Sequence, residues 1–243
     1  MSHRNRRLSA CLAAILLAAC SGGNAPPPPV DPAVAAKSAQ EAKAAAQFRL
    51  YEQMRTSGSF DLAAPLGEEL IKTYPGTAAA VRVQQTIAEV RSKADAQRES
   101  RRLSRLWAYN AVPEAGGTQY TAAIASKDPL PGAGARIRLV LRQHPKWGQS
   151  VYLLLDNATF DCSKGCATLP VSFDGAPAQR MKATIPPGGE PALFIDDDKG
   201  FIAKLEKSKT VAIDVTIKGV GPKSEVFEVG GYDATKLPEK PKK

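Results

Sequence analysis

The sequence has few of the residue types on which most enzymes and metal proteins depend. Its 243 residues include two histidines, four cysteines and two tryptophans. Beyond the first residues of the chain, His144 is the one imidazole, and it lies in a Gln-His-Pro-Lys-Trp-Gly segment. A histidine-rich zinc site is therefore excluded, and a Ser-His-Asp arrangement would have to use a histidine beside a proline turn. We expect His144 to be an exposed loop residue.

Common catalytic motifs are also missing. The sequence contains no Gly-x-Ser-x-Gly elbow, phosphate-binding loop or Cys-x-x-Cys pair. Its dense acidic cluster, Asp196–Asp198, fails the EF-hand calcium pattern because Gly200 takes the fifth place and Lys207 the twelfth. We interpret this cluster as a strand end followed by a helix N-terminus, where aspartates cap amide groups.

A hydrolase would have to use an acidic pair such as Asp156 and Asp161. Carboxylates at strand ends are common without catalysis, so this alternative has little support. The sequence thus predicts a protein that is not an enzyme, with no catalytic residue, no cofactor and no metal ligand.

The first apolar run, from Leu12 to Ala19, is too short to cross a bilayer, which takes about 20 residues. It follows three arginines and ends in small residues, which are the parts of an export signal. Its end, Leu17-Ala18-Ala19-Cys20, resembles the lipobox of bacterial lipoproteins.

This resemblance implies that residues 1–19 are a signal peptide and that Cys20 is lipidated after the cut. Ser21 replaces the aspartate that would retain such a protein in the inner membrane, which implies the periplasmic face of the outer membrane. Several acyl chains, at about 0.8 kcal/mol per buried methylene, would then hold the chain on the membrane. An ordinary secretory signal cut near Ala19, with Cys20 incidental, is the alternative.

Removing the signal peptide takes away three arginines and no acidic residue, so the formal net charge falls from +9 to +6. An exported protein rarely meets nucleic acid, so no nucleic-acid partner is expected. The basic residues gather in two places, a helix stripe and the C-terminal tail: Arg91, Arg98, Arg101, Arg102 and Arg105, and Lys236, Lys240, Lys242 and Lys243. We expect solvated surfaces there, with weak contact to an anionic envelope polymer as the alternative.

The cysteines Cys162 and Cys166 remain once Cys11 leaves with the signal and Cys20 carries lipid. An even remainder in an oxidising compartment predicts one disulfide. The three-residue spacing is not that of a redox motif, so we expect a structural staple.

The rest of the chain divides by composition and periodicity. Residues 20–32 form a proline-rich spacer with a reach of roughly 35 Å. Residues 33–106 predict three helices, near 32–55, 61–74 and 77–106. Part of this segment resembles a tetratricopeptide-type helical pair, at Tyr51, Gly58, Phe60, Ala63 and Tyr74–Thr77. Because only about one and a half repeats are present, a plain helical hairpin or helix trimer is the alternative.

Residues 107–235 alternate with a period of two, which predicts an antiparallel β-sandwich with one short helix near 198–207. Residues 236–243 are expected to be a disordered basic tail. The whole chain is thus predicted to be α+β. The β segment resembles a module of type VI secretion-associated lipoproteins and of the invasion-associated locus B family. The resemblance rests on Val151–Leu155, Phe160–Cys162 with Cys166, Val171–Gly175, Leu193–Ile195 and Phe201–Ile202.

This modular order, without a reactive cluster, predicts a non-enzymatic adaptor that binds another protein of the envelope or of a secretion system. An immunity or inhibitor lipoprotein directed against an envelope-acting toxin would have the same anchor and compact domains. The sequence does not separate these two functions.

Overall fold

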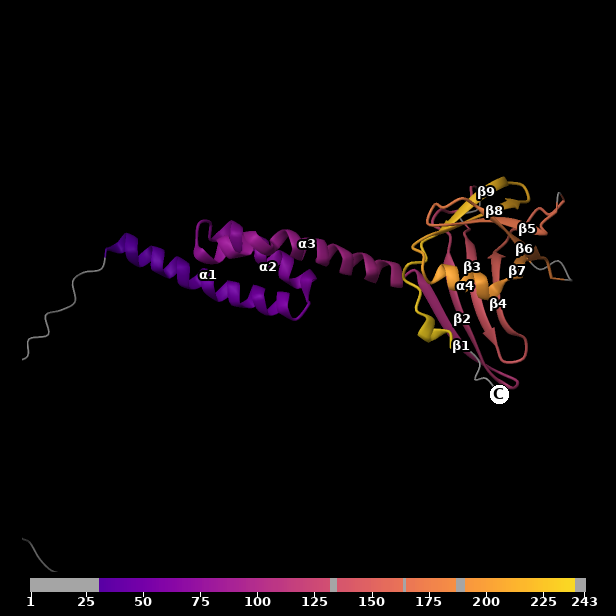
Figure 1. The fold of residues 1–243 in the computed structure, drawn as a ribbon, viewed down its shortest axis with the longest axis horizontal. Coiled ribbons are helices and arrows are strands. Elements are labelled where there is room, and N and C mark those ends of the chain that lie inside the picture. The colour runs from indigo at the N-terminus through magenta and orange to yellow at the C-terminus, as the bar shows by residue number, and fades with distance from the viewer. Residues whose placement is uncertain (1–30, 132–134, 164, 187–190, 239–243) are drawn as a thin grey trace, which may run out of the picture.

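The computed structural model describes residues 31–131, 135–163, 165–186 and 191–238. Cys20, the signal peptide, most of the proline-rich spacer and residues 239–243 of the tail lie outside these ranges. The described chain forms a helical arm, made of α1–α3, that leads into a β domain, as Figure 1 shows. None of the helices in these ranges is long and apolar enough to cross a membrane. The α+β prediction, with helices first and antiparallel strands second, is confirmed.

The helical arm contains α1 (Pro32–Thr56), α2 (Phe60–Thr73) and α3 (Ala78–Ser104). Two of its helices begin at side-chain caps that the sequence signals. The Asp31 carboxylate accepts the Ala33 N–H, and the Thr77 hydroxyl accepts the Ala80 N–H. The three helices pack on one another around a small core of alanines, aliphatic residues and Tyr51, whose hydroxyl lies 2.7 Å from that of Thr86. This is the helix trimer that the sequence left open.

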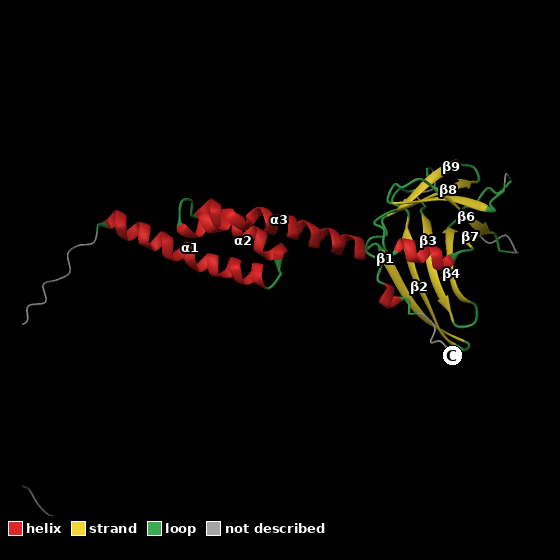
Figure 2. Ribbon diagram, in the orientation of Figure 1, coloured by secondary structure: helices red, strands yellow, loops and turns green. Residues whose placement is uncertain are grey.

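Gly67 allows this packing. A Cβ atom at this position would lie 2.8 Å from side-chain atoms of both Tyr51 and Ile87, closer than carbon atoms normally approach. The absence of a side chain therefore lets α2 approach α1 and α3. The second half of α3 continues beyond the other helices and enters the β domain (Figure 2).

The described part of the β domain contains nine strands: β1 (Trp107–Glu114), β2 (Gly117–Ala125), β3 (Ile137–His144), β4 (Gly148–Leu155), β5 (Thr168–Phe173), β6 (Gln179–Thr184), β7 (Ala192–Ile195), β8 (Val211–Ile217) and β9 (Gly221–Phe227). Their order is β1-β2-β3-β4-β7-β6-β5-β8-β9, and every pairing is antiparallel. Strands β1–β4 and β7 form one layer, and β5, β8 and β9 form the other. Strand β6 pairs with β7 on one side and β5 on the other, and so joins the two layers.

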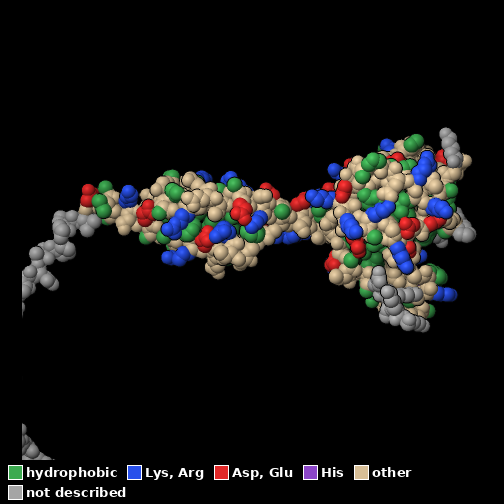
Figure 3. Space-filling view, in the orientation of Figure 1, with side chains coloured by type: hydrophobic (Ala, Val, Ile, Leu, Met, Phe, Trp, Pro, Cys, Tyr) green, Lys and Arg blue, Asp and Glu red, His purple; other side chains and the backbone are tan. Residues whose placement is uncertain are grey.

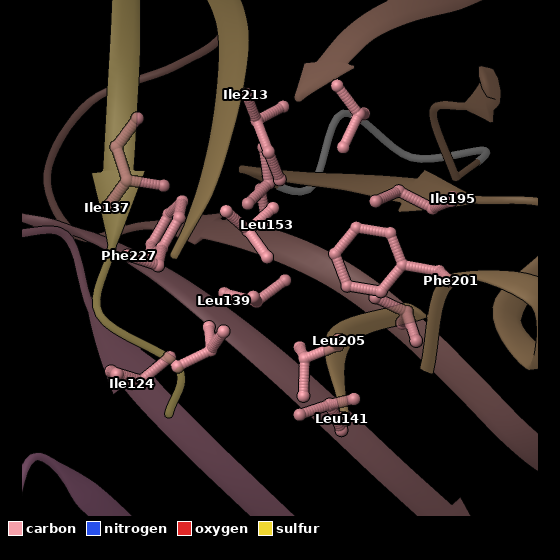
Figure 4. Close-up of a cluster of buried hydrophobic side chains, with 14 of the residues drawn as sticks. Ile124, Ile137, Leu139, Leu141, Leu153, Ile195, Phe201, Leu205, Ile213 and Phe227 are labelled. Carbon is pink, nitrogen blue, oxygen red and sulfur yellow. The ribbon is translucent and has the colours of Figure 1, made fainter. Parts of the chain in front are cut away.

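One hydrophobic core lies between the layers. Leu139, Leu141 and Leu153 from one layer face Ile213 from the other (Figure 4). The helix α4 (Asp198–Leu205), which the sequence predicts near 198–207, adds Phe201 and Leu205 to the same cluster. Burial of these side chains stabilises the domain by about 25 cal/mol per Å² of apolar surface removed from water.

The C-terminal end of the β domain differs from the predictions. Strand β9 lies at the edge of the sheet, where Pro222, its second residue, is tolerated. The short 3₁₀ helix Ala234–Lys236 follows, and Leu237 is only 8% exposed. The prediction of a disordered tail from residue 236 was therefore wrong at its start, since Leu237 supplies an apolar contact to the core.

Candidate binding surface

The face of β1–β4 and β7 that points away from the core carries the most distinctive group of side chains. Side chains alternate along a strand, so Leu139 and Leu141 enter the core while Val140 points to this outer face. Strand register then places Ala123, Val140, Tyr152 and Phe194 next to one another across four strands. Val140 is only 4% exposed because its neighbours on this face cover it.

A guanidinium lies among the aromatic rings of this face. The Arg142 guanidinium carbon is 5.5 Å from the ring centre of Trp147 and 5.4 Å from that of Tyr152. The Tyr152 ring in turn lies 4.9 Å from that of Phe194. We call these four side chains, Trp147, Arg142, Tyr152 and Phe194, the aromatic row. Cation–π contacts of this kind are worth about 0.5–1 kcal/mol at exposed sites.

His144 holds Trp147 in place. It ends β3 and is 6% exposed, so the prediction of an exposed loop histidine was wrong. Its Nδ1 accepts the backbone N–H groups of Lys146 at 3.0 Å and Trp147 at 3.1 Å, which fixes the turn between β3 and β4. The turn folds the indole of Trp147 onto the imidazole, with ring centres 3.9 Å apart. Trp147 nevertheless remains 66% exposed.

Arg142 differs in its charge environment from Arg138, which lies four residues earlier on the same strand and face. Arg138 forms an ion pair with Asp156 at 2.6 Å. Arg142 donates from Nε to the Ser150 hydroxyl at 3.1 Å, and none of the described carboxylates lies within ion-pair distance of it. Its register neighbours, Thr121 and Ser150, are uncharged. The row thus presents a half-buried positive charge that has no counter-ion among the residues that the structure describes.

A shallow groove of about 450 Å³ lies on the other layer, between β5, β8 and β9. Pairing of β5 with β8 covers Val171–Phe173 and does not extend to Pro170, which has no N–H to donate. The groove opens at that point, and Asp161, Asp214 and Lys223 are among the residues that line it. Its polar lining and openness make it a weaker candidate than the aromatic row.

The predicted disulfide between Cys162 and Cys166 is present beside this groove. It closes the loop that follows Phe160, which forms an isolated bridge with Ile217. The Asp161 N–H donates to the Thr216 carbonyl at 2.8 Å. The disulfide thus closes this loop on itself, while the Phe160 bridge and the Asp161 hydrogen bond hold the loop against β8.

The acidic cluster behaves as the helix-cap interpretation predicts. The Asp197 carboxylate accepts the Gly200 N–H at 3.0 Å, and that of Asp198 accepts the Lys199 N–H at 2.7 Å. Asp196 turns elsewhere and accepts the Thr184 hydroxyl. No group of three or more His, Cys, Asp or Glu side chains able to hold a metal occurs in the described ranges. Asp156, from the hydrolase alternative, is engaged by Arg138.

Two acidic residues of the β domain have shifted pKa values. Burial raises the pKa of Glu225, which is 6% exposed on β9, and a hydrogen bond with Ser126 opposes that rise. Backbone N–H groups of Thr210 and Lys209 lower the pKa of Asp174 by binding its charged form. Both effects follow from local structure and neither residue belongs to the aromatic row.

The arginine stripe of α3 is largely neutralised within the chain. Arg91 pairs with Glu68 at 2.6 Å, Arg101 with Asp61 at 2.9 Å, and Arg98 with Asp95. Arg102 binds both Glu99 and Glu228 at 2.7 Å, which links α3 to the β domain. Figure 3 shows acidic and basic side chains mixed along the arm. The solvated-face prediction therefore fits this surface better than a site for an anionic polymer.

Comparisons with known proteins give little further guidance. No family model matches the sequence, and no curated protein matches it. A partial likeness exists to the crystal structure of invasion associated protein B from Bartonella henselae. The two chains are 14% identical, with a TM-score of 0.36, and the match covers 52% of this chain and 85% of that chain. This likeness is too distant to transfer a function.

Sequence reasoning missed the aromatic row. The sequence alternates with a period of two over residues 107–235, and this pattern assigns Arg142 and Tyr152 each to one face of a strand. The pattern does not tell which strands are neighbours. The pairing of β4 with both β3 and β7 brought these residues together.

Proposed function

We propose that this protein is a non-enzymatic, outer-membrane-anchored periplasmic lipoprotein that acts as an adaptor for another envelope or secretion-system protein. The aromatic row is its binding surface in this proposal. One observation carries it: Trp147, two-thirds exposed, lies beside Arg142, whose guanidinium also lies over the ring of Tyr152 on the outer face of the sheet. Trp, Tyr and Arg are the residues most enriched among those that dominate protein interfaces.

The rigidity of the row supports the same proposal. Stacking on His144 and the hydrogen bonds of the turn restrict the Trp147 side chain before any partner arrives. Immobilising a side chain on binding costs about 0.5–1.5 kcal/mol, and a side chain that is already ordered avoids much of that cost. A preorganised Trp147 is therefore suited to be the central contact.

The helical arm gives the proposed adaptor its reach. With 27 residues at about 1.5 Å each, α3 alone is roughly 40 Å long. The proline-rich spacer, with a reach of roughly 35 Å, sets only the distance between the lipid anchor and the start of the helical arm. The length of the arm is added to that distance. The proposal places the β domain well beyond that distance from the membrane, where a partner away from the lipid surface is accessible.

In vivo photo-crosslinking tests the binding role. A photoreactive phenylalanine analogue at position 147 should give a specific protein adduct in cells that express the full-length chain. The same analogue at Lys218, exposed on the other layer, and at Leu62, exposed on α2, serves as a control. The absence of an adduct at 147, or equal adducts at all three positions, would contradict the proposed surface.

The anchor is tested separately. Labelling with radioactive palmitate should mark the wild-type protein and be lost in Cys20→Ala. Identification of the adduct also separates the two functions: a toxic envelope enzyme whose activity falls on binding would replace the adaptor by an inhibitor.

A further inference from the structure

The charge of Arg142 points to the chemistry of the partner, an inference that rests on the proposed function above. The rings of Trp147 and Tyr152 flank the guanidinium and restrict its contact with water. Its Nε–H is used by Ser150, which leaves the two terminal nitrogens to donate. None of the described carboxylates pairs with this half-buried cation, so a partner that supplies an anion gains a charge-assisted hydrogen bond there.

The planar shape of the Arg142 guanidinium indicates which kind of anion it binds. The planar fork of an arginine binds a carboxylate through two parallel hydrogen bonds. A phosphate carries up to two charges and is typically held by several donors at once, for example an arginine cluster. The aromatic row contains one arginine, Arg142. Arg138, on the same face of β3, is already paired with Asp156. A single guanidinium between apolar rings therefore suits one carboxylate better than a phosphate.

The apolar surroundings favour a protein segment as the source of that carboxylate. Phe194 and Tyr152 extend the surface to one side of Arg142, and Trp147 extends it to the other. An occupant that buries these rings must offer apolar side chains next to its acid. We propose that the aromatic row binds a segment of the partner in which an aspartate or glutamate is flanked by apolar residues, with the carboxylate on the terminal nitrogens of Arg142.

Peptide binding to the full-length protein tests this proposal. The probe is a decapeptide in which glutamates alternate with leucines, and its twin carries glutamine at each glutamate. Trp107 is buried, so a change in tryptophan fluorescence on titration reports mainly on the exposed Trp147. We expect the acidic peptide to bind at least about fivefold more tightly than its twin, and this preference to weaken as salt is raised.

The variants Arg142→Lys and Arg138→Lys form a matched pair on one strand and one face. Arg142→Lys retains the charge but not the fork, and should remove most of the fivefold preference. Arg138→Lys should change the affinity less than about twofold, because Arg138 already has a carboxylate. Thermal unfolding of each variant shows that it remains folded.

Equal binding of the two peptides, binding of neither, or full affinity in Arg142→Lys would overturn the proposal. Displacement of the acidic peptide by millimolar inorganic phosphate, but not by acetate, would overturn it in favour of a phosphate ligand. The proposed adaptor function can fail independently of this proposal. A partner that crosslinks at position 147 equally well in Arg142→Lys would support the adaptor function and refute carboxylate binding by Arg142. Selective binding of the acidic peptide without any crosslinked adduct would support carboxylate binding and refute the adaptor function.

Discussion

Substitution of Gly231 by alanine should separate the helical arm from the β domain. A Cβ atom at this position would lie 2.3 Å from the carbonyl carbon of Leu103 and 2.4 Å from the amide nitrogen of Ser104. Both are backbone atoms at the end of α3, so no side-chain rotation can relieve the overlap. The two backbones would have to move apart by about 1 Å to reach an ordinary contact distance.

The energetic cost follows from what that movement breaks. Overpacking typically costs about 1–3 kcal/mol. The Arg102–Glu228 ion pair spans the same junction and is partly exposed, so its loss adds less than about 1 kcal/mol. We expect a total loss of about 2–3 kcal/mol, which for a domain of this size lowers the melting temperature by several degrees.

Gly230→Ala is the matched control. Its Cβ would lie 3.4 Å from Leu103 and Lys209, an ordinary contact, and the Gly230 N–H bond to the Lys209 carbonyl would remain. Differential scanning calorimetry measures both variants, and spin labels on α3 and β4 report the distance between arm and β domain. A melting temperature of Gly231→Ala equal to that of Gly230→Ala, with an unchanged label distance, would refute this account of the junction.

Three further predictions concern the β domain. His144→Phe retains a ring under the indole but leaves two turn N–H groups without an acceptor, and should lose about 1–2 kcal/mol in urea unfolding. The Cys162→Ser/Cys166→Ser pair should lose about 2 kcal/mol by loop entropy, measured as a lower melting temperature. Glu225→Gln should stabilise the protein at pH 7, and this gain should vanish near pH 4. The sign follows from the raised pKa: the protonated carboxyl is favoured by folding, so stability is lost as pH rises from about 4.5 through the folded value.

Each of these has its own control. His144→Asn places a side-chain oxygen near the Nδ1 position, so it should lose much less stability than His144→Phe. Equal losses in His144→Asn and His144→Phe would show that the hydrogen-bond acceptor is unimportant. Loss of the crosslinked adduct in a folded double-serine mutant would show that the disulfide has a functional role. If the gain in stability of Glu225→Gln does not change with pH, the gain comes from packing and not from the titration of Glu225.

Much of the fold could be read from residue periodicity and punctuation. Asp31-Pro32 and Thr77 mark the starts of α1 and α3, and the structure shows both capping bonds. The prediction of antiparallel strands with one short helix after residue 107 was confirmed. These predictions were correct because helix capping and strand alternation depend on residues that are close together in the chain.

The sequence by itself thus determined which segments are helices and strands, which face of each is apolar, and where a disulfide forms. Only the tertiary structure decided that His144 is buried, that Leu237 joins the core, and that Trp147, Arg142, Tyr152 and Phe194 form one surface. The physical reason is register. Alternation assigns a side chain to a face, but strand order and pairing, fixed by burial of the whole core, choose its neighbours on that face.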